Sequence, residues 1–164
     1  MFLKILDISR IVIVSLAFYL GYSVGFAEEV YNAKAQLHIM IPLIIVAIAG
    51  ASGFEGLFFG KESAKLKGFE TGSNYQKQSA IALLSYAFVA VWVYFANWGI
   101  MAELTILFAF LFFFVFSATN HAIQAIKNKN YKWQNIYPPF ITLILITGLI
   151  YPLVMVFRGL SSKF

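Results

Sequence analysis

The chain has 164 residues, of which 61% are hydrophobic and only 12% are charged. A soluble domain has roughly 45–50% apolar and about 25% charged residues, so this composition excludes an ordinary water-soluble domain. The net charge of +5 does not indicate a nucleic-acid partner, because the lysines lie in short loops beside apolar runs rather than on one polar face. The absence of cysteine excludes disulfides, thiol catalysis and Cys-ligated metals.

Five stretches are long and apolar enough to cross a bilayer, which requires about 20 residues at a rise of 1.5 Å each. The predicted spans are residues 8–27, 37–59, 79–98, 104–126 and 137–157. We therefore expect an all-α, polytopic transmembrane helix bundle with a single membrane domain covering residues 1–164. Only a tight turn around Gly99 joins the third and fourth spans, so they should form an antiparallel hairpin.

The first span has an alternative interpretation as a secretory signal. Lys4 and Arg10 form a basic region, an apolar run follows, and Gly25-Phe26-Ala27 is an acceptable cleavage site. We expect the segment to be retained as a membrane span.

The basic residues predict the orientation of the chain. With the N-terminus in the cytoplasm, the other side of the membrane carries only Lys34, Arg158 and Lys163. The cytoplasmic segments then carry Lys4, Arg10, Lys61, Lys65, Lys67, Lys77, Lys127, Lys129 and Lys132. This bias follows the positive-inside rule, although the two C-terminal cations run against it. We expect a multi-pass protein of the cell inner (plasma) membrane.

Local signals predict where the helices begin and end. Gly60 can end the second helix in a left-handed conformation. Ser73 followed by Gln76 has the spacing of a capping box and predicts the start of the third helix. Pro138 and Pro139 suit the first turn of the fifth helix, where their missing N–H groups are not needed.

Small residues predict the packing faces, because helices in lipid associate by close contact at such positions. They recur four residues apart in the first and second spans, at Gly21, Gly25, Ala49, Gly53, Gly56 and Gly60. The second span is the richest of the five, so we place it at the centre of the bundle. Close approach of a ligand or ion to the backbone is the alternative use of such positions.

Aromatic residues and proline distinguish the last two spans. Phenylalanines surround the fourth span, so part of it should face lipid, a partner subunit or a bound quinone, sterol or acyl chain. In the fifth span, Pro152 removes the backbone hydrogen bond to Gly148, and Thr147 is the nearest hydroxyl group that could satisfy the freed carbonyl.

Polar residues inside spans are costly, so each is a functional candidate. Glu55 and His121 lie at matching depth near the cytoplasmic ends of the second and fourth spans. The predicted pocket consists of Glu55, Gln78, Asn120, His121 and Thr142. Such a pocket could exchange a proton or bind a cation. The alternative is a structural cluster of hydrogen bonds between helices near the headgroups.

Three short segments of the chain carry a resemblance to known proteins. They are the segment from Gly68 to Gln76, Asn120-His121 and Asn130-Tyr131. With these segments, the chain resembles a family of small multispan bacterial membrane proteins of unknown function. It implies a fold of the same kind and supplies no function. Gln78 and Thr142 stand where the family pattern has carboxylates, which puts an acid-dependent role in doubt for this chain.

These patterns include no complete catalytic constellation, cofactor fingerprint or metal-ligand set. His38 and His121 should lie near opposite faces of the membrane, which argues against haem binding by both. We therefore expect a non-catalytic membrane protein without cofactor or metal, serving as an accessory subunit of an assembly or as a homo-oligomer. Its partners would be the lipid bilayer and other membrane subunits or copies of itself, with no nucleic acid.

Two other functions stay open at this point. The first is a small transporter or channel for a proton, cation or small metabolite, centred on Glu55 and His121. The second is a membrane enzyme acting on a lipid or quinone, which an ordered ligand beside residues 112–116 would favour.

Overall fold

The computed structural model describes residues 2–161, and these form an all-α bundle, as the hydrophobic pattern predicts. The elements are α1 (Phe2–Gly25), α2 (Ala33–Ile45), the π-helical segment η1 (Val46–Gly50), α3 (Ala51–Phe58), α4 (Gly60–Lys67), α5 (Asn74–Phe95), α6 (Ile100–Lys127) and α7 (Trp133–Ser161). Since α2, η1 and α3 follow one another without a loop, residues 33–58 form one long helical segment.

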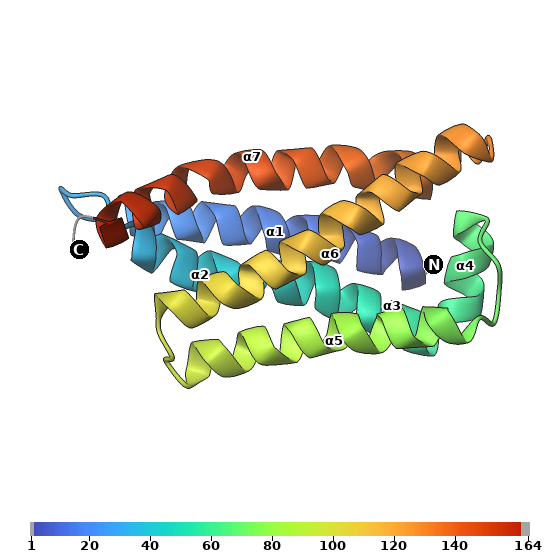
Figure 1. Cartoon of the computed structure of the whole chain (residues 1–164), viewed down its shortest axis with the longest axis horizontal. Helices are drawn as coiled ribbons and strands as arrows, with labels where there is room; N and C mark the ends of the chain where they lie inside the picture. Colours follow the sequence, from blue (N-terminus) through green and yellow to red (C-terminus); the bar gives the residue numbers. More distant parts are fainter. Residues whose placement is uncertain (1, 162–164) are drawn as a thin grey trace.

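The long helices run the length of the molecule and alternate in direction (Figure 1). The N-terminus lies at one end, together with α4, the loop at Gly68 and the loop between α6 and α7. The opposite end holds the α1–α2 loop, the α5–α6 turn at Gly99 and the end of α7. These are called the Gly68 end and the Gly99 end below.

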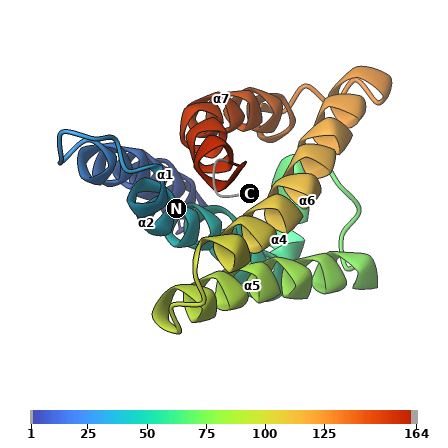
Figure 2. The same ribbon diagram turned by 60° about the vertical axis from the view of Figure 1, so that its left-hand side comes forward.

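Four of the described helices are long and apolar enough to cross a membrane. They are Ala33–Phe58, Asn74–Phe95, Ile100–Lys127 and Trp133–Ser161. Each begins about one turn before the predicted span, because polar residues extend the helix beyond its apolar run. The 24-residue α1 is not among these four, and it lies beside α2 over most of its length (Figure 2).

Gly60 does not end the second span as predicted. The helix ends at Phe58, the chain bends at Phe59 with φ −126°, and Gly60 begins the short helix α4. The glycine with the left-handed conformation is Gly68, at φ 72°, which ends α4. Hydropathy gives no signal for α4, because this short helix is mostly polar.

Of two other predicted helix starts, one is confirmed and one is displaced. Ser73 precedes α5 but makes no side-chain capping bond, and Gln76 instead donates from Nε2 to the carbonyl of Gly60 at 2.7 Å. The predicted start of this helix is therefore confirmed, since α5 begins at Asn74, but the side-chain bonds of a capping box are not formed. Pro138 and Pro139 lie in the second turn of α7 rather than the first, because the helix already begins at Trp133.

The centre of the core is formed mainly by α2, which supplies half of the largest fully buried side chains. They are Gln36, Leu37, Met40, Ile41, Ile44 and Ile45. Leu107 and Phe110 of α6 and Leu145 and Leu149 of α7 complete the same core cluster. The placement of the second span at the centre agrees with this burial.

The small residues lie where helices approach closely. A Cβ atom on Gly25 of α1 would lie 2.7 Å from Oε1 of Gln36, and one on Gly21 would collide with the Met40 side chain. On the other side of the bundle, a Cβ on Gly53 would lie 2.7 Å from the backbone oxygen of Ala80. Gly56 also faces Ala80, Gly60 faces Gln76, and Ala49 is fully buried. These contacts join α1 to α2, and both α3 and α4 to α5.

The carbonyl freed by Pro152 is satisfied by a different helix from the one expected. Tyr22 of α1 donates its hydroxyl to the backbone oxygen of Gly148 at 3.1 Å, whereas Thr147 donates to Leu143. The proline therefore creates an acceptor that fastens α7 to α1.

The hairpin of α5 and α6 opens away from its turn. The two helices adjoin at the Gly99 end and diverge toward the Gly68 end, where α6 lies against α7 (Figures 1 and 2). Asn97, at φ 52°, and Gly99, at φ 86°, supply the left-handed residues that this short turn requires.

Candidate functional site

Glu55 is the centre of a polar network at the Gly68 end. Its side chain is 6% exposed, and its two oxygens accept hydrogen bonds from Arg10 Nη2, Ser63 Oγ and Lys67 Nζ, the last at 2.9 Å. The bend at Phe59 folds α4 back toward the bundle, and Ser63 and Lys67 lie four residues apart on one face of that helix. Gly53 and Gly56 face α5, which leaves Glu55 on the side of α1.

Arg10 connects this carboxylate to a second one. Its Nη1 lies 2.5 Å from Oδ1 of Asp7, three residues earlier on α1. Burial raises the pKa of Asp7, and the charge of Arg10 opposes that effect. Two cations, Arg10 and Lys67, thus face two carboxylates, and their charges balance.

His121 belongs to the same network through Asn135. The Nδ1 atom of His121 lies 2.8 Å from Oδ1 of the fully buried Asn135. Asn135 Nδ2 donates to the carbonyl of Lys67 at 3.0 Å and to that of Asn130 at 3.3 Å, so its Oδ1 is the acceptor and His121 Nδ1 is the donor. The ring of Phe69 packs on the imidazole with a centroid separation of 5.3 Å.

The α6–α7 loop holds the end of α4 in place. Asn130 Nδ2 donates to the carbonyl of Lys67 at 2.9 Å, and Lys132 Nζ donates to that of Lys65 at 3.1 Å. The name Glu55 network is used below for Asp7, Arg10, Glu55, Ser63, Lys67, His121, Asn130 and Asn135. It joins α1, α3, α4, α6 and α7 at one end of the bundle.

Of the five residues predicted for the pocket, the network contains two. Glu55 and His121 are connected through Lys67 and Asn135 rather than by direct contact. Gln78 and Asn120 are exposed, and neither is hydrogen-bonded to the network within residues 2–161. Thr142 is buried, but its hydroxyl donates to the carbonyl of Pro138 in its own helix at 2.9 Å.

Sequence reasoning missed the four side chains of this network that form hydrogen bonds with Glu55 or His121. Arg10 falls within the first predicted span, where a charge requires an opposite partner, so its position was an available signal. Ser63 and Lys67 were assigned to a loop, and Asn135 to the residues before the fifth span. Nothing in their spacing shows that they approach Glu55 and His121.

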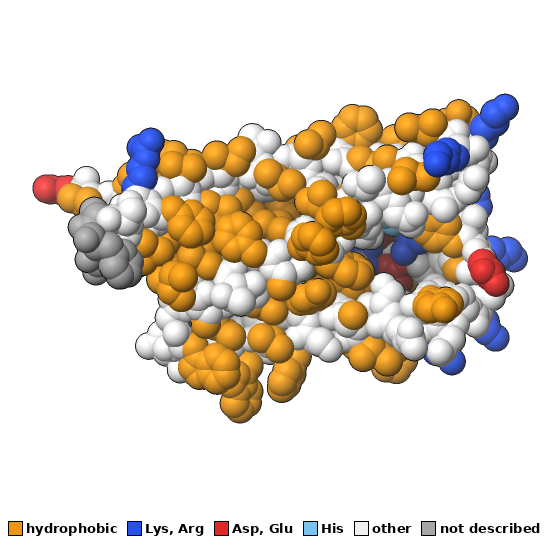
Figure 3. Space-filling view, viewed as in Figure 1, with side chains coloured by type: hydrophobic (Ala, Val, Ile, Leu, Met, Phe, Trp, Pro, Cys, Tyr) orange, Lys and Arg blue, Asp and Glu red, His pale blue; other side chains and the backbone are white. Residues whose placement is uncertain are grey.

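The network is partly open to the surroundings. The side chains of Arg10 and Lys67 are 18% and 31% exposed. On the face drawn in Figure 3, acidic and basic atoms are visible in a hollow toward the Gly68 end. Apolar side chains cover the middle of the same face. Water could therefore reach the cations of the network while the carboxylate of Glu55 stays covered.

Chemically, the network can hold charges and hydrogen bonds in fixed positions. Within the described residues, no group of three or more His, Cys, Asp and Glu side chains could hold a metal ion. The Glu55 carboxylate already accepts from three side-chain donors, two of them cations that remain charged at neutral pH.

A family model described as a family of unknown function (DUF6790) matches residues 11–162, which is most of the chain. No curated protein and no solved structure matches this chain. The match agrees with the resemblance to a family without known function, and it gives no role to Glu55 or His121.

Proposed function

Because the chain belongs to the DUF6790 family, whose function is unknown, its role has to be argued from its own residues, and we propose that it is a non-catalytic integral membrane protein. In this proposal it serves as an accessory or structural subunit of a membrane assembly, or as a homo-oligomer. Its location is the inner (plasma) membrane of the cell.

The observation that carries this proposal is that the Glu55 carboxylate already accepts hydrogen bonds from three side chains, two of them cationic. A carboxylate that binds and releases a proton or cation during transport needs a state in which it is free of permanent cations. Glu55 instead contacts Arg10 of α1 and Lys67 of α4, and Ser63 provides a third donor. Removing one member of a buried ion pair is strongly unfavourable, so this arrangement supports a structural role that holds the helices together.

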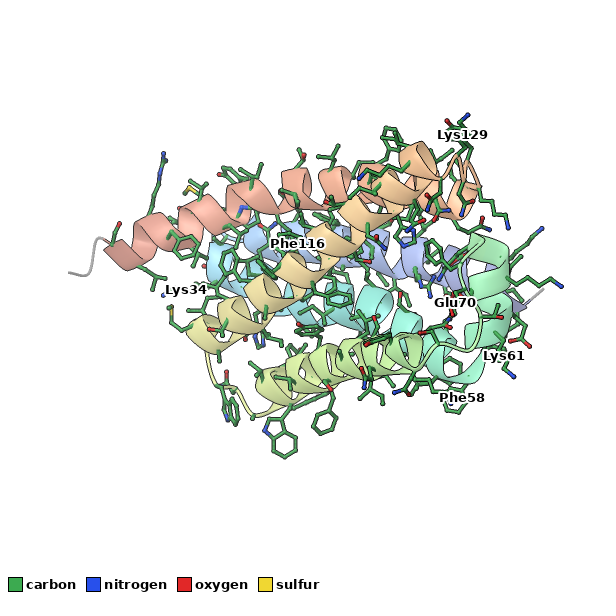
Figure 4. All side chains as sticks on the ribbon, turned by 45° about the vertical axis from the view of Figure 1, so that its right-hand side comes forward. Lys34, Phe58, Lys61, Glu70, Phe116 and Lys129 are labelled. Carbon is green, nitrogen blue, oxygen red and sulfur yellow. The ribbon has the colours of Figure 1, made fainter. Side chains whose placement is uncertain are left out.

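The distribution of charge supports a topology of five spans with the N-terminus in the cytoplasm. Lys61 and Lys129 lie at the end of the molecule opposite to Lys34 (Figure 4). The Gly68 end carries nine of the twelve Lys and Arg residues of the chain, and Lys163, assigned to the other side, lies outside the described residues. Under the positive-inside rule, the Gly68 end is cytoplasmic and α1 is the first span.

The outward-facing side chains support a role within an assembly. Phe88 of α5 and Phe112 and Phe116 of α6 are exposed on the bundle, while Phe110 of α6 is fully buried. The aromatic side chains of α6 thus divide between the core and the outside. In a membrane, the outer set meets lipid or the helices of another subunit.

A small transporter for a proton or cation is the second candidate. The partial exposure of Arg10 and Lys67, together with a hollow that holds charged atoms toward the Gly68 end (Figure 3), favours it. The two proposals differ in what Glu55 does. Proteoliposomes that contain the wild type, Glu55→Gln or Glu62→Gln would separate them, since Glu62 is an exposed carboxylate on neighbouring α4.

A structural role predicts that none of the three proteins carries proton, Na⁺ or K⁺ flux above that of empty liposomes. A wild-type flux that disappears in Glu55→Gln and persists in Glu62→Gln overturns it.

A further inference from the structure

A second buried carboxylate lies at the Gly99 end, far from the Glu55 network. Glu103 is only 3% exposed, and its Oε1 lies 2.6 Å from Nδ1 of His38 on α2. The imidazole of His38 stacks on the ring of Tyr94 of α5, with centroids 4.5 Å apart and planes inclined by 24°. Three helices thus meet at one pair of titratable groups.

The local structure favours a carboxylate at Glu103. This residue lies in the first turn of α6, where the helix dipole stabilises a negative charge. Gly99 precedes the helix and offers no side-chain cap, so the acid is the anionic group of that turn. The fourth predicted span begins at residue 104 and leaves Glu103 in the loop before it, but α6 begins at Ile100 and includes this residue.

Glu103 differs from Glu55 in the kind of cation that faces it. Glu55 contacts an arginine and a lysine, which stay protonated at neutral pH. Within residues 2–161, the only basic side chain within ion-pair distance of Glu103 is His38. Histidine is the side chain whose charge changes between about pH 5 and about pH 8. The charge balance at Glu103 therefore depends on one exchangeable proton.

We propose that His38 and Glu103 bind one proton between them, and that this proton holds the α5–α6 hairpin against α2. With the proton bound, the pair is neutral overall, as an ion pair or as a neutral hydrogen bond. Once the proton is lost, Glu103 is a buried carboxylate without a cation. Such a charge is unfavourable in an apolar environment, so water has to enter and the contact of α6 with α2 loosens.

No other histidine lies near this end within residues 2–161. The other charged and titratable groups on the elements around α2 include Tyr22 of α1, Glu28, Glu29 and Tyr31 of the α1–α2 loop, Lys34 of α2, Tyr94 of α5, and Tyr151 and Arg158 of α7. Tyr22 and Tyr31 donate their hydroxyls to Gly148 and Gln36, and the two loop carboxylates are exposed. The ordinary ranges of Tyr, Lys, Arg and exposed Glu lie outside about pH 5 to 8.

The position of the pair determines the side of the membrane from which the proton reaches it. In the proposed topology, the Gly99 end faces the outside of the cell. Protons from the exterior would then set the position of the hairpin, without any change at the Glu55 network on the cytoplasmic side. The inference itself rests on the contacts of His38 and does not require that topology.

The test uses the fact that the chain has only two histidines. Nitrogen NMR of the full chain, with its histidines labelled, gives one set of signals for His38 and one for His121. We expect the imidazolium signals of His38 to persist to a lower proton concentration in the wild type than in Glu103→Gln, because the carboxylate that contacts the ring favours its charged form. The signals of His121 should be unchanged, which shows that the variant is folded.

The position of the hairpin is measured separately, in a chain without native cysteine. Spin labels on Ala27→Cys and Ala96→Cys, both exposed, report the distance between the α1–α2 loop and the hairpin. We expect one distance population at about pH 5 and a second, broader one at about pH 8 in the wild type, but not in Glu103→Gln.

Equal persistence of the His38 imidazolium in the wild type and Glu103→Gln overturns the proposal. A distance distribution that does not respond to pH overturns it as well. If Glu103→Gln does not fold, the wild type alone decides, because the distance change and the His38 titration must then have the same midpoint.

Discussion

Replacing Glu55 by glutamine removes the charge of the network while leaving nearly the same volume. Arg10 and Lys67 then face each other across a neutral amide, and the amide nitrogen brings further donors toward two cationic donors. The charge balance of the cluster is lost, since Asp7 is the remaining carboxylate of the network. We expect the variant to insert and fold with reduced stability.

The structure bounds the magnitude of this loss. Breaking a fully buried ion pair costs about 3–5 kcal/mol, whereas exposed pairs contribute about 1 kcal/mol or less. The side chains of Arg10 and Lys67 are 18% and 31% exposed, so the cations can partly recover their hydration. We therefore expect Glu55→Gln to lower the free energy of unfolding by about 2–3 kcal/mol.

Unfolding in a fixed detergent, followed by circular dichroism, measures this change. Glu62→Gln is the matched control, and as an exposed surface substitution it should stay within about 0.5 kcal/mol of the wild type. In a cycle with Lys67→Gln, the coupling energy between the two sites should be about 1 kcal/mol. If Glu55→Gln is as stable as the wild type, the argument for a structural network is refuted.

Three further predictions concern the packing of the helices and the Gly99 end. A methyl group at Gly53 would press on the backbone of Ala80, so Gly53→Ala should lower the free energy of unfolding by about 1–3 kcal/mol. Gly159→Ala should change it little, because the added Cβ meets no side chain or other helix among residues 2–161 within 4 Å. Tyr22→Phe leaves the Gly148 carbonyl unsatisfied and should lower the free energy of unfolding by about 1–3 kcal/mol. In a Pro152→Ala background the loss should be much smaller, because the backbone N–H of residue 152 is restored. Equal losses in both backgrounds would contradict the role of Tyr22 as the donor to Gly148. Burial raises the pKa of Tyr31 from 10.0 to about 12, and electrostatic repulsion from Tyr22 and Tyr151 adds to this effect. The difference in phenolate absorbance between the wild type and Tyr31→Phe should therefore have its midpoint near pH 12. Because the unfolded phenol ionises first, the contribution of Tyr31 to stability is complete below about pH 10 and is lost toward pH 12, and a midpoint near 10 would show that its hydroxyl is not covered.

Hydropathy predicts the long helices well, because crossing a bilayer sets the length of an apolar run. Its errors lie at the helix ends, where other forces act. Asn74 and Trp133 begin helices about one turn before the apolar run, since a helix continues as long as its backbone bonds are satisfied. The short helix from Gly60 to Lys67 is mostly polar and leaves no trace in the hydropathy.

The candidate site could be predicted only in part, because depth along a helix is visible in sequence and direction around it is not. Glu55 and His121 were placed together by their matching distance from the helix ends. Lys67 and Asn135, which connect them, lie in segments without a periodic pattern. Gln78 was placed in the pocket by depth alone, and the structure turns it outward.

The pair of His38 and Glu103 shows the same limit at the other end of the bundle. A boundary error of about one turn moved Glu103 from a helix into a loop, where a carboxylate needs no explanation. Once α6 begins at Ile100, the same residue is buried and requires a partner.

The measurement that tests the proposed function most directly is native mass spectrometry of the protein extracted gently from its own membrane. A single chain has a mass of 18.5 kDa. The proposal predicts an assembly, seen either as a multiple of that mass or as that mass together with the masses of other membrane subunits. A monodisperse species of one chain, without partners in any mild detergent, would contradict it.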